Sequence, residues 1–203
     1  MKQVWFSIYI CVVLLTASNE LVAAEPPMNI VRNTTDQVLD RVQSDRDALR
    51  QDPAKMYVLV AELIFPHFNF QIMARWVLGT HWKEADEATR TEFVDQFRKL
   101  LVRTYATALL EFSDQVITYP DDSAIVKGRT VEVRQEIDQS GSEPILIGYR
   151  LHNTLGNWKV FDVTVDGVSL VKTYRASFSS LIRDGGLLGL IAGLSKKNQE
   201  INQ

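Results

Sequence analysis

The part of this chain that most restricts its fold is the second half, where hydrophobicity alternates with the period of a β-strand. Val131, Val133 and Ile137, for example, alternate with charged side chains. The pattern predicts four strands, at residues 116–119, 125–137, 145–153 and 158–165. The connections between them are short and rich in turn residues, whereas parallel neighbours need a long crossover. We therefore expect a four-stranded antiparallel meander with one apolar face and one solvated face.

The first half of the chain instead has the 3.6-residue period of amphipathic helices. Helices are predicted at residues 28–51, 56–65, 70–78 and 86–112, and another begins near Val168. Asn69 can cap the third of these helices, and Asp184-Gly185-Gly186 ends the last one. A further apolar helix or lid is expected at residues 187–194. Because helices must cover the apolar face of the sheet, the expected fold class is α+β.

The first 24 residues have the pattern of an export signal. Lys2 is followed by an apolar run at residues 4–16, and Val22-Ala23-Ala24 provides small residues for cleavage near Ala24. The run is too short to span a bilayer comfortably. We expect a cleaved signal peptide at residues 1–24 and one domain at residues 25–203, without the single cysteine, Cys11.

Charge and histidine spacing exclude two classes of function. The net charge is −3 and there is no basic stripe, so the chain is a poor candidate for binding nucleic acid. His67, His81 and His152 lie on different predicted elements without ligand partners three or four residues away. No zinc site is therefore expected.

Asp162 is the best candidate for a buried acid, because it lies in a predicted strand between Phe161 and Val163. One interpretation is a small-molecule isomerase or hydrolase on a cone-shaped sheet, with Asp162 as the base and Tyr149 or Tyr174 supplying a hydroxyl. The other interpretation is a structural hydrogen-bond acceptor, for Arg175 or for a backbone turn. No further catalytic constellation accompanies Asp162, so the sequence favours the structural role.

Large apolar side chains are numerous on the faces predicted to point inward. A tightly filled core and a cavity for an apolar ligand use the same residue types. Composition alone therefore leaves open a ligand-binding protein and a purely structural envelope protein with a filled core.

Two blocks of sequence are more specific. The first is Leu78-Gly79-Thr80-His81-Trp82, downstream of Phe65-Pro66-His67-Phe68-Asn69-Phe70. The second is Asp-Gly-Val-Ser-Leu-Val-x-x-Tyr-Arg-x-x-Phe, from Asp166 to Phe178. In order and spacing these blocks resemble the periplasmic phospholipid carriers of the MlaC-like, toluene-tolerance family. Asn69 departs from the resemblance, since the family often has aspartate there, but both residues can cap a helix.

The resemblance implies a periplasmic protein that binds a phospholipid and catalyses no reaction, without a cofactor or a metal. It also implies a monomer that exchanges lipid with two partners. These are an outer-membrane lipoprotein complex and an inner-membrane ABC transporter with a lipid-shuttling ring, in a system for outer-membrane lipid asymmetry.

The site residues follow from facing and periodicity within that resemblance. An apolar pocket between helices and sheet is expected to be lined by Phe65, Phe68, Ile72, Trp76, Phe97, Leu101, Tyr105, Val133, Ile147 and Tyr149. The strand-to-helix corner is expected to depend on Asp162, Gly167, Ser169, Tyr174, Arg175 and Phe178. Tyr174 and Arg175 either hold this corner or lie near the mouth of the pocket.

Overall fold

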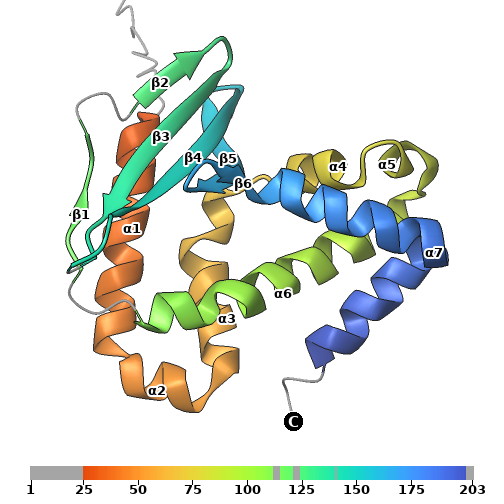
Figure 1. Cartoon of the computed structure of the whole chain (residues 1–203), viewed down its shortest axis with the longest axis horizontal. Coiled ribbons are helices and arrows are strands. Elements are labelled where there is room, and N and C mark those ends of the chain that lie inside the picture. The colour runs from red at the N-terminus through yellow and green to blue at the C-terminus, as the bar shows by residue number, and fades with distance from the viewer. Residues whose placement is uncertain (1–24, 112–114, 121–123, 140, 200–203) are drawn as a thin grey trace, which may run out of the picture.

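The computed structural model describes residues 25–111, 115–120, 124–139 and 141–199, so the predicted export signal lies outside the described residues (Figure 1). The helices of the first half are α1 (Pro27–Ser44), α2 (Arg46–Gln51), α3 (Pro53–Leu63), η1 (Phe65–His67), α4 (Phe70–Leu78), α5 (His81–Glu84) and α6 (Glu87–Glu111). They confirm the predicted helical half. None of the helices in this described part is long and apolar enough to cross a membrane.

Short polar side chains cap the starts of several of these helices, and Asn69 is the cap that the sequence predicts. The Asp52 carboxylate accepts a hydrogen bond from the Ala54 amide at 3.0 Å, and the Asn69 side-chain oxygen accepts one from the Ile72 amide at 3.0 Å. The Asp86 carboxylate accepts one from the Thr89 amide at 2.7 Å. Each bond satisfies an amide that has no partner within the first turn of its helix.

The described residues of the second half form one antiparallel sheet of six strands. They are β1 (Ile117–Thr118), β2 (Ala124–Lys127), β3 (Thr130–Ile137), β4 (Ile145–Thr154), β5 (Asn157–Val165) and β6 (Val168–Ser169). The order is β1-β3-β4-β5-β6, and β2 also pairs with β3.

The antiparallel meander is thus confirmed, but the predicted number of four strands is wrong. The segment predicted as one strand at residues 125–137 is a hairpin, because the chain reverses at Gly128, whose φ is +64°. The other extra strand is β6, a pair of residues after the turn at Asp166-Gly167.

The last helix, α7 (Leu170–Gln199), is interrupted at Gly186, which has φ 70° and ψ 174°. The sequence predicts this break correctly. Beyond it, Leu190, Ile191 and Leu194 are buried, and the end of α7 packs along α6. Residues 187–194 are therefore a packed helix in this structure.

Figure 1 shows the sheet with α1 at one end of the molecule and α4, α5 and α7 at the other, with α6 running between them. α1 packs against β3, whereas α4 and α7 pack against β5. The expected α+β architecture is confirmed, with helices from both ends of the chain against the sheet.

The buried residues fall into three hydrophobic clusters. The largest joins α4, α6 and α7, the second joins α1, α2, α3 and α6, and the third lies between the sheet and α1. Two half-buried aromatic side chains connect them: Phe65 touches the first and second clusters, and Phe68 touches the first and third. The core is therefore divided.

Candidate functional site

The apolar inner face of the sheet is packed at one end and open at the other. Val131, Leu151 and Val160 are buried in the cluster beneath α1. At the other end, the inner-face side chains are only partly buried; we call this set the open end, and it comprises Ile137, Ile145, Ile147, Val163 and Val165. They share one face because Ile137 pairs with Ile145 and Ile147 pairs with Val165 in the ladder. The open end is an apolar surface without a complete cover.

Half-buried side chains also project from the helices. Leu101 and Tyr105 come from α6, Ile72 from α4, and Phe65 and Phe68 from the segment between α3 and α4. Burial and the neighbouring Tyr174 hydroxyl raise the pKa of Tyr105 to about 12. This phenol therefore stays neutral at physiological pH.

Seven of the ten residues predicted to line a pocket are of this half-buried kind: Phe65, Phe68, Ile72, Leu101, Tyr105, Ile147 and Tyr149. The structure places the other three differently. Phe97 and Val133 are 0 % exposed and belong to packed clusters. Trp76 is 51 % exposed, because α4 turns its opposite face, with Met73, Ala74 and Val77, into the core.

The prediction from sequence missed a polar group on the inner face, of which it had named only Tyr149. Gln135 is only 3 % exposed, although it lies between Val133 and Ile137 on the apolar face. Its side-chain oxygen accepts hydrogen bonds from the hydroxyls of Thr35 and Tyr119, both at 3.3 Å, and its amide donates to the Tyr149 hydroxyl at 3.0 Å. We call Thr35, Tyr119, Gln135 and Tyr149 the inner polar cluster. The signal that could have found it is the single amide in an otherwise apolar alternation.

Asp162 has a structural role at the strand-to-helix corner. It is 2 % exposed, and its carboxylate accepts hydrogen bonds from the Ser169 hydroxyl at 2.7 Å, the Val171 amide at 3.1 Å and Arg150 at 3.0 Å. Ser169 in turn accepts from the Lys172 amide at 3.1 Å. The two side chains together cap α7. Of the two partners that the sequence left open for a structural acceptor, the backbone is the one found, at the Val171 amide, and the cationic partner is Arg150 instead of Arg175.

The remaining corner residues hold the turn and the helix. Gly167 follows Asp166 in a turn where both have positive φ, 79° and 49°, as two-residue hairpin turns require. Tyr174 packs edge-on against Phe97 with ring centroids 5.3 Å apart, and Phe178 is buried against Phe93. Arg175 lies against Gly79 at the end of α4, where a β-carbon would come within 3.0 Å of its guanidinium.

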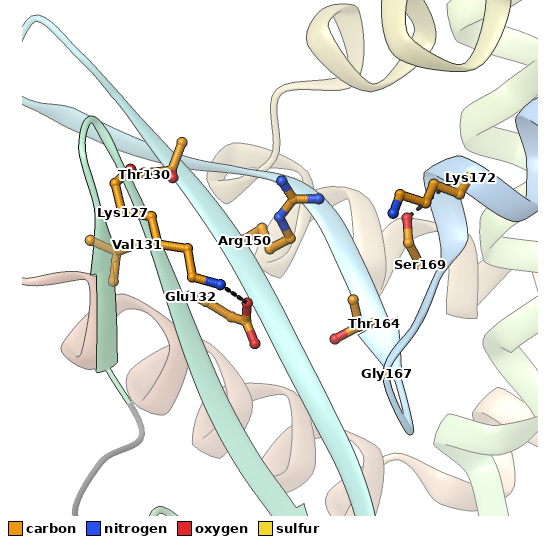
Figure 2. Close-up of a pocket in the computed structure, with 9 residues that line it drawn as sticks. All are labelled: Lys127, Thr130, Val131, Glu132, Arg150, Thr164, Gly167, Ser169 and Lys172. Carbon is orange, nitrogen blue, oxygen red and sulfur yellow. Dashed lines mark hydrogen bonds and ion pairs between the residues drawn. The ribbon is translucent and has the colours of Figure 1, made fainter.

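The outer, solvated face of the sheet carries a polar hollow of about 270 Å³ (Figure 2). Lys127 and Glu132 lie 3.8 Å apart within it, and Arg150 and Ser169 line it towards α7. A second pocket, of about 510 Å³, lies between α3 and α6 and includes Val58 and Arg103. Neither pocket is lined by any of the ten predicted residues. No group of three metal-ligating side chains occurs in the described part of the chain.

Comparisons with family models and with known proteins give matches over most of the chain. The model of the MlaC protein family matches residues 32–196. The intermembrane phospholipid transport system binding protein MlaC of Haemophilus influenzae is 26 % identical over 198 residues, which cover 95 % of this chain and 92 % of that protein. The toluene tolerance protein ttg2D of Pseudomonas putida is 25 % identical over 166 residues, covering 81 % and 77 %.

A solved structure is similar as well. The phospholipid-binding protein from Ralstonia solanacearum, determined in complex with a phospholipid, superposes with a TM-score of 0.80 at 29 % identity. The match covers 88 % of this chain and 100 % of that one.

Proposed function

Because the chain belongs to the MlaC family, we propose that it binds a phospholipid and carries it between membranes. The observation that supports this most directly is the similarity, over the whole of the solved chain, to a protein that holds a phospholipid. The open end of the inner face supports it independently, as an apolar surface that helices do not fully cover.

A carrier is needed because phospholipids do not cross water alone at a useful rate. Two acyl chains of about 16 carbons expose roughly 30 methylene groups, and each disfavours water by about 0.8 kcal/mol. The sum, on the order of 24 kcal/mol, makes free diffusion negligible. A carrier has to enclose the tails, whereas the charged head group can stay in water.

We place the acyl chains over the open end of the inner face, against the half-buried side chains of the helices. Ile147 and Tyr149 form the sheet side of this site, and Leu101 and Tyr105 of α6 form part of the helical side. Phe65 and Phe68 lie at the junctions of the three clusters. A core that is divided into separate clusters can make room for a ligand between them with less repacking than a single close-packed core.

The partners and the compartment extend this proposal. A carrier between two membranes works in the periplasm, after cleavage near Ala24. It would receive or deliver lipid at an outer-membrane lipoprotein complex and at an inner-membrane ABC transporter with a lipid-shuttling ring. Asp162 has no catalytic part in this function, because its carboxylate accepts hydrogen bonds from the Ser169 hydroxyl and the Val171 amide and forms an ion pair with Arg150.

The first test is native mass spectrometry, with organic extraction, of protein purified from a periplasmic fraction without detergent. We expect a bound mass that matches a phospholipid, at about one per chain. A protein that is bare, and that stays bare after incubation with phospholipid vesicles, would contradict the proposal.

The place of the tails is tested by introducing a charge. Leu101→Asp and Ile147→Asp should each reduce the bound lipid at least about tenfold, since a buried unpaired carboxylate costs several kcal/mol. Leu155→Asp, in an exposed turn where the side chain is 98 % accessible, is the matched control and should retain its lipid. If a folded Ile147→Asp protein keeps its lipid, that residue lies outside the site.

A further inference from the structure

We propose that the inner polar cluster binds an ester carbonyl oxygen of the carried lipid, and so selects diacyl lipids over lipids without such carbonyls. The inference rests on the proposed function, because it concerns the same site. It starts from the position of Gln135, a polar side chain on the apolar inner face of the sheet. Gln135 is in register with Ile147 on β4, which is in register with Val165 on β5.

The cluster borders the apolar surface where we place the tails. Gln135 pairs directly with Ile147 of the open end, and Tyr149 pairs with Val163. Thr35 reaches the cluster from α1, and Tyr119 reaches it from the segment after β1. The polar groups therefore lie next to the open end. In a phospholipid, the ester carbonyls likewise stand where the acyl chains end.

The cluster has more donors than it uses. Three hydroxyls and one amide carry five polar hydrogens, whereas three hydrogen bonds join the side chains through Gln135. The Thr35 hydroxyl also interacts with the hydroxyls of Tyr119 and Tyr149. Two hydrogens, one on the Gln135 amide and one on the Tyr149 hydroxyl, remain to bond a hydroxyl oxygen of the cluster or a ligand. A lipid oxygen that reaches these hydrogens can accept a hydrogen bond from either of them.

The charge of the cluster favours a neutral acceptor. Burial raises the pKa of both Tyr119 and Tyr149, so both phenols stay protonated and able to donate. The cluster contains neither a carboxylate nor a cation. Beside it, the Arg32 guanidinium lies 4.7 Å from the centroid of the Tyr119 ring, but Arg32 and Asp36, which act on Tyr119 with opposite charges, are both exposed. An anionic phosphate buried among the four side chains would therefore meet only neutral hydrogen-bond donors and would pay a large desolvation penalty. A carbonyl oxygen is neutral, accepts hydrogen bonds and is covalently joined to the tails.

The simpler explanation is that the cluster only holds α1 against the sheet. The two explanations differ in what a variant should change. A structural cluster affects stability but is indifferent to the linkage of the lipid, whereas a binding cluster changes the preference between linkages. The experiment must therefore report on preference.

The protein is incubated with vesicles that contain equal amounts of diacyl and dialkyl phosphatidylethanolamine of the same chain length. Native mass spectrometry then measures the ratio of the two bound lipids. A neutral hydrogen bond corresponds to about a 2- to 10-fold effect, so we expect the wild type to prefer the diacyl lipid by that factor. Gln135→Leu and Tyr149→Phe should bring the ratio close to one.

Val131→Ala is the control, because it removes buried volume from the packed end of the same face and leaves every donor in place. It should keep the wild-type ratio. If Gln135→Leu does not fold, Tyr149→Phe, which deletes a single hydroxyl, decides the question.

A wild-type ratio of one, or a folded Tyr149→Phe protein that keeps the wild-type preference, overturns the inference but leaves the carrier function intact. If neither lipid binds to the wild type, the proposed function itself fails. The two failures are thus distinguishable.

Discussion

At the scale of single residues, Asp162 shows how a carboxylate that resembles a catalytic base can be wholly structural. One side chain joins β5 to the start of α7 through Ser169 and the Val171 amide, and it pairs with Arg150 from β4. The bond to the amide satisfies a donor that the helix itself leaves free. The corner motif therefore fixes the direction in which α7 leaves the sheet.

Asp162→Asn tests this assignment. Asparagine can still accept from the Val171 amide, but it loses the ion pair and presents hydrogens towards Arg150. We expect the free energy of unfolding to fall by about 1–3 kcal/mol in guanidinium titrations, with an unchanged lipid load. Asp166→Asn is the control, because asparagine suits the positive φ of this exposed turn and keeps an oxygen that accepts from the Leu146 amide. It should change stability by less than about 0.5 kcal/mol. A well-folded Asp162→Asn protein that has lost its lipid would contradict a purely structural role.

The raised pKa of Tyr105 predicts that the free energy of unfolding decreases at alkaline pH. Its pKa is about 12 in the folded protein, because burial and the Tyr174 hydroxyl disfavour the phenolate, against about 10 in the unfolded chain. Its contribution is therefore fully present below about pH 10 and is lost as the pH rises towards 12. Partial exposure keeps the loss below the limit of about 1.4 kcal/mol per pH unit.

The measurement compares guanidinium unfolding at about pH 9 and about pH 11 for the wild type and Tyr105→Phe. The variant should lose less stability between the two, because phenylalanine cannot ionise. Equal losses in both proteins would mean that this phenol does not contribute.

At the scale of elements, the two motifs that carry the family resemblance meet in space. Gly79 ends α4 with φ +59°, and Arg175 of α7 lies against it. Gly79 of the first motif and Arg175 of the second thus form one contact between α4 and α7. A glycine is required there for two reasons, the backbone conformation and the space taken by the guanidinium.

Gly79→Ala should therefore lower the free energy of unfolding by about 1–3 kcal/mol. Adding Arg175→Ala should recover only part of the loss, since it removes the close contact but not the backbone strain. Gly185→Ala is the matched control, because nothing lies within 4 Å of its β-carbon position and its φ is not positive. If Gly79→Ala is as stable as this control, the contact is not what requires the glycine.

At the scale of the whole molecule, the three clusters suggest that the protein is completed by its ligand. Phe65 and Phe68 connect clusters that otherwise remain separate, and the open end of the sheet stays partly uncovered. A lipid that binds only the folded state stabilises it by mass action.

Removal of the lipid should accordingly lower the melting temperature. A ligand at about 100 times its dissociation constant contributes about 2.7 kcal/mol, which is about 5–10 °C for a domain of this size. Calorimetry of lipid-loaded protein, and of protein extracted and refolded, measures the difference. The Ile147→Asp protein, treated in the same way, should show no change. Equal melting temperatures for loaded and extracted wild type would contradict a stabilising ligand.

Local patterns were sufficient for much of the fold. Asn69 predicted a helix start, Gly186 lies at the predicted break, and the alternation of Val131, Val133 and Ile137 predicted the inner face. These features depend on neighbours a few residues apart, which is the range that periodicity and capping report. The hairpin at Gly128 was missed, because both of its arms have strand character and the turn is short.

The sequence by itself therefore determined the α+β fold class, the order of a helical half before a strand half, and the strand-to-helix corner, since each follows from local periodicity and from short motifs. Only the tertiary structure decided that Trp76 faces solvent, that Phe97 and Val133 are fully packed, that Asp162 pairs with Arg150, and that Gln135 joins three hydroxyls. These outcomes depend on which side chains from distant segments meet. Periodicity states which face of an element is apolar, but not what lies opposite it.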